Sequence, residues 1–183
     1  MKRVIAVLVI VACVFGTRAS AQEKSTNAHA TATSIGSTSI SKIKLTVVRV
    51  DSEEIDGENG RGTNAVDGNP DTFWHTQWQD ASPECPHEIV IKLENPTSIK
   101  GFTYLPRQDE EENGTIKDYE FYVSDDGKEF GKPVKKGSLE TDKRKKTVAF
   151  EPVKCSFIKL RALSEINDAA WTSAAEIGVV PAE

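Results

Sequence analysis

Residues 87–93 have the sequence HEIVIKL, in which the apolar residues Ile89, Ile91 and Leu93 occupy every second position. This two-residue period is typical of a β-strand that buries one face. Further short apolar runs lie at residues 43–50, 99–105, 119–123, 147–150, 158–162 and 177–179. Turn dipeptides such as Asn113-Gly114 separate them, and no stretch of ten residues carries a clear helical apolar stripe. About seven short strands without helices predict an all-β fold, a two-sheet sandwich or jelly roll.

The first 21 residues have the features of a cleaved signal peptide. Two basic residues, Lys2 and Arg3, precede an apolar run at residues 4–15, and a small-residue cleavage site ends at Ala21. The apolar run is too short to span a bilayer as a stable helix. We therefore expect a secreted or periplasmic chain whose mature form begins at Gln22.

A second interpretation of this region is a lipoprotein signal. Residues 10–13 loosely resemble a lipoprotein box, which would acylate Cys13. Cleavage after Ala21 is favoured because Cys13 lies early and the better cleavage site follows it. Residues 22–42 are rich in Ser, Thr and Ala without apolar periodicity, so they are expected to form a flexible leader. The predicted domain then covers residues 43–183.

The charge of the mature chain excludes several classes of partner. Without residues 1–21 the chain has 20 basic and 28 acidic residues, a net charge of −8. An acidic domain repels phosphate backbones and anionic lipid, so neither nucleic acid nor a membrane is an expected partner. Two cysteines remain, Cys85 and Cys155, and export permits a disulfide. Sequence alone leaves open whether they pair or are separate buried thiols.

Motifs of common enzyme classes are absent from the sequence. The chain has no G-x-S-x-G motif, and His87-Glu88 is not followed by the second histidine of an H-E-x-x-H motif. Only His75 and His87 lie in the predicted domain. The sequence therefore favours a binding module over an enzyme.

Three loops carry the candidate site residues. Residues 64–72 are rich in oxygen donors, but their spacing is not that of an EF-hand, and on spacing alone a metal-free Asx-turn is favoured. In residues 73–78, FWHTQW, strand alternation sends Trp74 and His75 to opposite faces, so one Trp is expected in the core. His75 is then either a ligand contact or a structural histidine. Arg107 follows a strand and Pro106, and we expect it to be an exposed side chain that contributes little to folding. Aromatic rings with Arg, His and Asn suit sugar recognition.

Four strings in the chain resemble a known family. They are NAVDGNPDTFWHTQW (64–78), PHEIVIKL (86–93), IKGFTYLPRQDEEENGTIKDYEFYVSDDGKEFGKPV (99–134) and IKLRALSEINDAAWTSAAEI (158–177). They resemble the discoidin, or coagulation factor V/VIII C-type, domain, and are most similar to its family 32 carbohydrate-binding modules. The resemblance covers residues 47–180. It implies a galactose-binding-like jelly-roll β-sandwich that binds terminal galactose or N-acetylgalactosamine of glycans without catalysis, in some cases alongside a separate glycoside-active enzyme.

The resemblance also implies a structural calcium ion and a set of sugar ligands. The positions matching the family's metal site are Asn64, Asn69 and Ala175 through backbone oxygens, and Asp67, Thr72 and Glu176 through side chains. Glu176 supplies the remote carboxylate that the loop lacks, which reverses the preference for a metal-free turn. The positions matching the sugar site are His75, Trp78, Arg107, Asn113 and Trp171.

The expected sugar site is one shallow pocket at the loop end of the sandwich. We expect His75 and Arg107 to contact the axial O4 of the sugar while an aromatic ring stacks on its apolar face. Three acidic residues at 110–112 replace a glycine that is common in relatives, and we expect them to face solvent rather than to exclude acidic glycans. The alternative functions are an adhesion module or a structural protein-interaction module without sugar binding.

Overall fold

The computed structural model describes residues 43–182 of the 183-residue chain. The predicted signal peptide, the Cys13 lipoprotein alternative and the leader lie outside the described residues. Between residues 43 and 182, no helix is long and apolar enough to cross a membrane.

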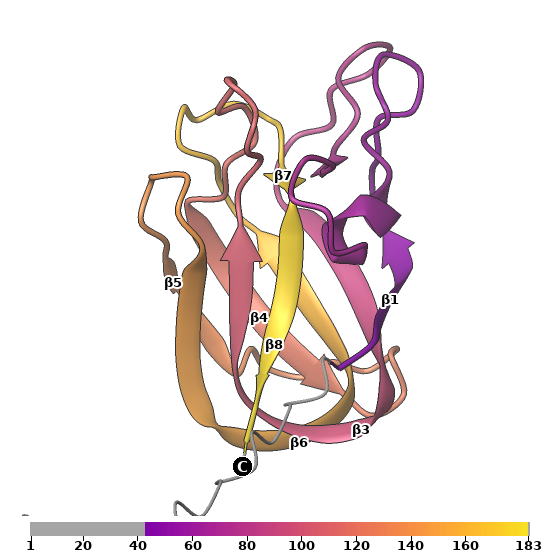
Figure 1. Cartoon of the computed structure of the whole chain (residues 1–183), viewed down its shortest axis with the longest axis vertical. Coiled ribbons are helices and arrows are strands. Elements are labelled where there is room, and N and C mark those ends of the chain that lie inside the picture. The colour runs from indigo at the N-terminus through magenta and orange to yellow at the C-terminus, as the bar shows by residue number, and fades with distance from the viewer. Residues whose placement is uncertain (1–42, 183) are drawn as a thin grey trace, which may run out of the picture. The chain divides into compact units, whose positions relative to one another are not determined.

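The described part of the chain is almost entirely β-structure, as predicted (Figure 1). Its elements are β1 (Leu45–Val50), the short 3-10 helix η1 (Gly62–Val66), β2 (Trp74–His75), β3 (His87–Leu105), β4 (Asp118–Ser124), β5 (Lys135–Ser138), β6 (Lys146–Ala162), β7 (Ser173–Ala174) and β8 (Glu176–Pro181). The main sheet has the order β1-β3-β6-β4-β5, and β8 pairs with β3. Strands β2 and β7 form a separate two-stranded ladder.

The two long strands, β3 and β6, build both layers of the sandwich. The first half of β3 pairs with β1, whereas its second half pairs with β8. Strands β3 and β6 pair along both halves, with register shifts between Lys92 and Thr97 and between Ile99 and Gly101. Both strands curve at the bottom of Figure 1. The expectation of separate short strands here is wrong, because the turn signal at Asn95-Pro96 marks a register shift within one strand.

Aromatic rings fill the space between the two layers. Phe102 in the second half of β3 stacks on Phe121 in β4, with ring centroids 4.4 Å apart and planes 4° apart. Ile89, Ile91 and Leu93 are all buried, as the two-residue period predicts, and Val90 on the opposite face is also only 1% exposed. Burying each such side chain contributes about 1.5–3 kcal/mol.

One strand of the fold was not expected, and the open question of whether the two cysteines pair is answered. Strand β5 (Lys135–Ser138) was missed because its four residues, KKGS, are all exposed and carry no apolar pattern. The two cysteines of the domain are free thiols, Cys155 buried and Cys85 partly buried, so they do not pair.

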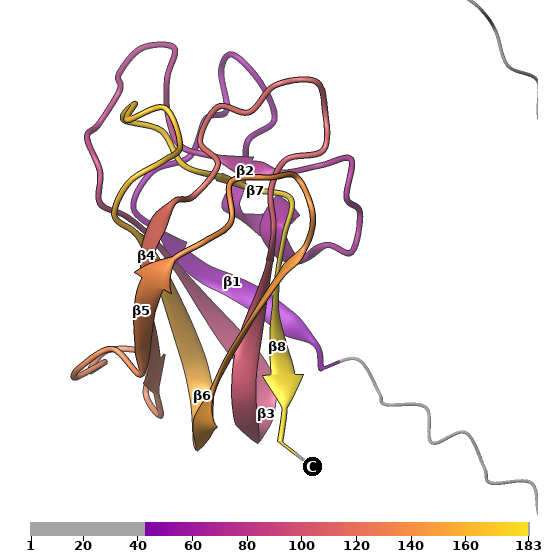
Figure 2. The ribbon, with the colours of Figure 1, turned by 90° about the vertical axis from the view of Figure 1, so that its left-hand side faces the viewer.

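Ladder β2–β7 and the longest loops lie together at one end of the sandwich, at the top of Figures 1 and 2. The C-terminal end of β8 lies at the opposite end (Figure 2). The side chains predicted to bind ligand are carried by the loops at the top.

Candidate functional site

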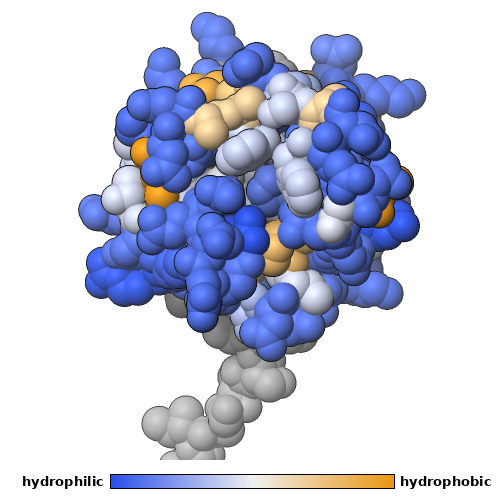
Figure 3. Space-filling view, turned by 90° about the horizontal axis from the view of Figure 1, so that it is seen from above, coloured by the Kyte–Doolittle hydropathy of each residue, from blue (hydrophilic) through white to orange (hydrophobic). Residues whose placement is uncertain are grey.

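The loop end contains one cavity of about 230 Å³ that collects the predicted sugar-site residues. Its lining residues are Glu58, His75, Trp78, Arg107, Glu111, Asn113 and Trp171. All five residues predicted for the sugar site therefore lie together, although they come from separate stretches of sequence. Figure 3 looks onto this end, where pale side chains gather in the middle of a mostly hydrophilic face.

His75 is held at the floor of the cavity by the β2–β7 ladder. It pairs with Ser173, and the neighbouring Thr76 N–H donates to the Thr172 carbonyl at 2.9 Å. Only 2% of His75 is exposed. Strand alternation correctly predicted a buried Trp74 and a His75 that a ligand can meet, but the loop at Gly60 packs directly against His75 and leaves little of it exposed.

The environment of His75 determines its protonation state. Burial is the main cause that lowers its pKa, so the ring is neutral at neutral pH. Its Nδ1 lies 2.6 Å from the Thr76 carbonyl oxygen. Because a carbonyl can only accept a hydrogen bond, Nδ1 carries the proton and donates. Nε2 then carries the lone pair and can accept a hydrogen bond from a ligand hydroxyl.

Asn113 is positioned by a tight turn that is bonded to the β7 loop. Gly114 has a φ of +78°, and an added Cβ would lie 2.6 Å from the Ser173 nitrogen. The Gly114 carbonyl accepts from Ser173 N–H at 2.7 Å, and Ser173 Oγ donates to the Asn113 carbonyl at 2.9 Å. The Asn113 side-chain amide has no hydrogen-bond partner among residues 43–182 and lines the cavity, so it can both donate and accept.

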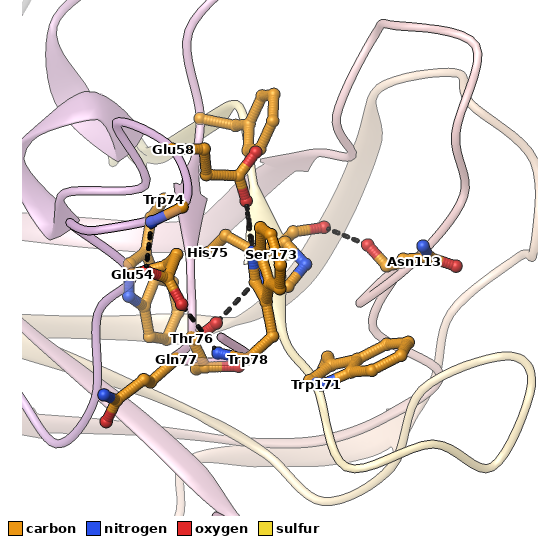
Figure 4. A network of polar contacts seen from close by, with 12 residues as sticks. Glu54, Glu58, Trp74, His75, Thr76, Gln77, Trp78, Asn113, Trp171 and Ser173 are labelled. Carbon is orange, nitrogen blue, oxygen red and sulfur yellow. Dashed lines mark hydrogen bonds and ion pairs between the residues drawn. The ribbon is translucent and has the colours of Figure 1, made fainter. Parts of the chain in front are cut away.

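Trp171 lies across the cavity from Glu58 (Figure 4). Its ring is 6.4 Å from that of His75, tilted by 47°, and its Nε1–H donates to Ser82 Oγ at 3.0 Å. Trp171 is partly exposed, so one part of the ring remains available for a ligand. An aromatic surface next to polar side chains suits the apolar face of a pyranose ring.

Arg107 differs from the exposed side chain expected from the sequence. It is only 6% exposed, because its guanidinium lies 4.2 Å above the centre of the Phe73 ring and forms a bidentate pair with Asp109. The Asp109 bonds use Nε and Nη2, at 2.7 and 2.5 Å. Nη1 has no partner within the described residues, so it can donate into the cavity.

Replacing Arg107 by alanine should therefore cost stability as well as ligand binding. Loss of the Phe73 contact and of the Asp109 bonds is expected to lower the free energy of unfolding by about 1–2 kcal/mol. Arg144 offers a matched control: it pairs with Asp142, an aspartate two residues before it rather than two after, but its side chain is 82% exposed. Arg144→Ala should change stability by less than about 0.5 kcal/mol. Equal denaturant midpoints for the two variants would contradict the buried role of Arg107.

Two carboxylates at the cavity were not expected from the sequence. Glu58 accepts from Trp78 Nε1 at 3.0 Å and lies 3.9 Å from His75 Nδ1 (Figure 4). No motif in the acidic stretch at residues 53–58 distinguishes this glutamate. Glu111 also lines the cavity, which corrects the expectation that residues 110–112 only face solvent. Glu110 and Glu112 do not line it.

Glu54 fixes the loops that carry Glu58 and Trp78. Its Oε1 accepts the N–H groups of Asp56 and Gly57, and its Oε2 accepts those of Trp78 and Gln79, all at 2.8–2.9 Å. These backbone bonds, led by that of Gly57, lower the pKa of Glu54 to about 2. The carboxylate therefore stays charged over the whole physiological range.

The residues matching the family's metal site lie beside β8. Asp67 accepts the Asn69 N–H at 2.8 Å and the Thr72 hydroxyl at 2.7 Å. Three residues that stand between the predicted ligands of this loop line one hollow of about 820 Å³ together with Glu176, and the other five predicted ligands are not among its lining residues. Among residues 43–182, no group of three or more His, Cys, Asp or Glu side chains could hold a metal by themselves. A cation here would depend on backbone and hydroxyl oxygens as well as two carboxylates.

The F5/8 type C domain model matches residues 48–177 of the chain. The chain belongs to the F5/8 type C domain family. This F5/8 type C domain is 41% identical over 119 residues to galactose oxidase from Gibberella zeae, a match that covers 64% of this chain and 18% of the relative. It is 37% identical over 123 residues to a sialidase from Micromonospora viridifaciens, a match that covers 67% of this chain and 19% of the sialidase. The domain thus spans less than a fifth of these relatives' length.

Solved structures of family 32 carbohydrate-binding modules have the same fold. The module CpGH89CBM32-5 from Clostridium perfringens, in complex with GalNAc-β-1,3-galactose, superposes with a TM-score of 0.68 at 34% identity, covering 75% of this chain and 95% of that one. The family 32 module of NanJ from C. perfringens, in complex with galactose, superposes with a TM-score of 0.65 at 28% identity. This match covers 74% of this chain and 93% of that one. These matches confirm the predicted resemblance and the β-sandwich fold.

A second histidine of this F5/8 type C domain holds the loop that carries Trp171. His87 is buried, and its Nδ1 lies 2.8 Å from Asp51 Oδ2 while its Nε2 lies 2.8 Å from the Ala170 carbonyl. Both partners are acceptors, so the two bonds are both made when both ring nitrogens carry protons. Burial opposes the charge, but the bonds to Asp51 and Ala170 outweigh it and raise the pKa of His87.

This arrangement predicts a dependence of stability on pH. Because the folded pKa of His87 lies above the unfolded value of about 6.5, its stabilising effect is fully present below about pH 6.5 and is lost as pH rises through the folded value. The melting temperature should fall as pH rises from about 6 to about 9. Replacing His87 by glutamine should flatten this slope in a calorimetric pH series. If His87→Gln keeps the wild-type slope of melting temperature against pH, the pH dependence comes from other groups.

Proposed function

We propose that the chain is a non-catalytic carbohydrate-binding module that holds a terminal galactose-type sugar in the 230 Å³ cavity. The observation that carries this proposal is the convergence of His75, Arg107, Asn113 and Trp171 on one cavity from distant parts of the sequence. Two of the similar solved structures hold galactose-containing ligands, which supports the same ligand class here.

The polar groups of the cavity complement a sugar hydroxyl. His75 Nε2 can accept a hydrogen bond while Arg107 Nη1 donates one, and a hydroxyl group needs one partner of each kind. An axial O4 projects from the ring and could contact both, whereas the equatorial O4 of glucose points elsewhere. Trp171 provides the surface for the C–H face of the ring.

Calorimetric titration with galactose, N-acetylgalactosamine and glucose tests this proposal. Because a monosaccharide offers few contacts, Kd should be on the order of 0.1–1 mM for the two galactose-type sugars and at least about 10-fold weaker for glucose. Equal affinity for glucose would refute the role of the axial O4. If no sugar binds, the carbohydrate proposal fails, and the adhesion or structural-module alternatives replace it.

We also propose that the chain itself has no enzymatic activity and is exported. The activities named for galactose oxidase and the sialidase belong to much longer proteins, of which this chain matches 18% and 19%. Its proposed partner is a separate glycoside-active enzyme, since weak single-site binding gains from tethering. Export would produce a mature chain that begins at Gln22, which mass spectrometry of secreted material can test; an acylated Cys13 would contradict it.

A structural calcium ion is proposed for a site formed by the 64–72 loop and the start of β8. All the groups concerned are oxygens, which suits a hard cation. Asp67, Thr72 and Glu176 would bind through side chains, and Asn64, Asn69 and Ala175 through backbone carbonyls. The ion would supply positive charge that links the loop to the start of β8, close to the ladder that holds His75.

Removal of calcium should therefore lower stability. A ligand that binds only the folded state stabilises it by mass action, so excess chelator should lower the melting temperature by several degrees. Asp67→Asn should weaken the calcium response, whereas Asp71→Asn in the same loop should not, because Asp71 is outside the predicted ligand set. An unchanged melting curve in chelator would exclude a structural ion.

A further inference from the structure

The cavity has an excess of negative charge. Two of its lining residues, Glu58 and Glu111, are carboxylates, and its one lining cation, Arg107, is already paired with Asp109. His75 is neutral because burial lowers its pKa. The charge that a ligand meets is therefore set mainly by the two glutamates.

Charged groups just outside the lining do not reverse this balance. The Glu54 carboxylate acts on His75 together with Glu58, and it stays ionised. Lys143 is a nearby cation, and its Nζ donates to the backbone carbonyls of Asp109 and Glu111. Counting Arg107 and Lys143 against Glu54, Glu58, Asp109 and Glu111 leaves an excess of two negative charges.

The two glutamates also have free hydrogen-bonding capacity. Glu58 uses Oε1 for Trp78, and its Oε2 has no partner among residues 43–182. Neither carboxylate oxygen of Glu111 has a hydrogen-bond partner within the same described residues. An ammonium group offers three donors and a positive charge, and a carboxylate accepts such bonds more strongly than neutral ones.

We propose that this cavity prefers galactose-type sugars with a free amino group, and that it disfavours those with a sulfate or carboxylate. The proposal rests on the proposed sugar-binding function and specifies its ligand class. Glu111 is the specificity-determining residue that this chain carries in the acidic 110–112 segment. Because Glu111 is exposed and screened by solvent, its effect is modest, about 2- to 5-fold in affinity.

Titration with galactosamine, galactose and galactose 6-sulfate at low and high salt tests the proposal. Galactosamine should bind about 5- to 10-fold tighter than galactose at low ionic strength, and galactose 6-sulfate should bind more weakly than galactose. The advantage of galactosamine should shrink as salt screens the carboxylates. Galactose, which is uncharged, should show little salt dependence.

Matched variants locate the effect. Glu111→Gln should reduce the galactosamine-to-galactose affinity ratio by about 2- to 5-fold, whereas Glu110→Gln, one residue away and outside the cavity, should leave the ratio unchanged. Galactosamine that binds no tighter than galactose, or a ratio that is the same in Glu111→Gln, would overturn the charge preference while leaving the sugar-binding function intact. Failure of both galactose and galactosamine to bind would overturn the function and the preference together.

Discussion

Replacing Trp171 by alanine is expected to abolish detectable sugar binding. The indole ring is the surface on which the apolar face of the sugar would stack, and such contacts contribute about 1–3 kcal/mol. A loss at the upper end of this range, about 3 kcal/mol, raises a Kd of about 0.1–1 mM by about 150-fold, beyond about 10 mM. Folding should be little affected, because Trp171 is partly exposed and its Nε1–H bonds only to Ser82 Oγ.

The conservative variant separates stacking from loop structure. Trp171→Phe keeps an aromatic face but loses the Ser82 bond, so it should retain most of the affinity measured by calorimetry. Trp171→Ala with near wild-type affinity would show that the ligand does not stack on this ring. A large drop in melting temperature for Trp171→Ala would instead assign the residue to the core.

Replacing Glu54 by glutamine is expected to cause the largest loss of stability of the substitutions considered. The Glu54 carboxylate accepts four backbone N–H groups, two from each of two loops. In glutamine an NH₂ group replaces one carboxylate oxygen, so two of the four backbone N–H groups would face a donor instead of an acceptor. We expect the melting temperature to fall by on the order of 10 °C. Sugar affinity should fall as well, because Glu58 and Trp78 lie on the released loops.

Glu53 provides the neighbouring control for this substitution. Its Oε2 accepts one backbone N–H, from Gly62, at 2.8 Å. Glu53→Gln can still present its amide oxygen to that single donor, so its melting temperature should change by only a few degrees. Similar thermal shifts for Glu53→Gln and Glu54→Gln would contradict the special role of the four-fold acceptor.

The strand pattern of the sequence predicted the fold class, but not the length of the strands. Alternation at Ile89, Ile91 and Leu93 reports local burial, and it correctly predicted a strand that buries these side chains, although not the burial of Val90. Continuity across Asn95-Pro96 depends on pairing with a distant strand, β6, which no local pattern contains. Strand β5 carries no apolar residue, so nothing in its sequence distinguishes it from a loop.

The dependence on contacts between distant parts of the chain also explains which site residues could be predicted from the sequence. His75, Arg107 and Trp171 stand in motifs that resemble a known family, so they could be proposed before the fold was known. Glu54 and Glu58 lie in an acidic stretch without such a motif, and their roles come from contacts about 20 residues away in sequence. The burial of Arg107 could not be predicted either, because it depends on the Phe73 ring beneath the guanidinium.

The most direct test of the account is a chemical-shift titration of the ¹⁵N-labelled protein with galactose. The account predicts saturable shifts for the Trp171 indole N–H, the Asn113 side-chain amide and the His75 ring nitrogens, with one Kd on the order of 0.1–1 mM. The turn between β4 and β5, which lies at the opposite end of the sandwich (Figure 2), should show none. An absence of shifts at these three residues at about 10 mM galactose, or saturable shifts confined to another surface, would contradict the assignment of this cavity as the sugar site.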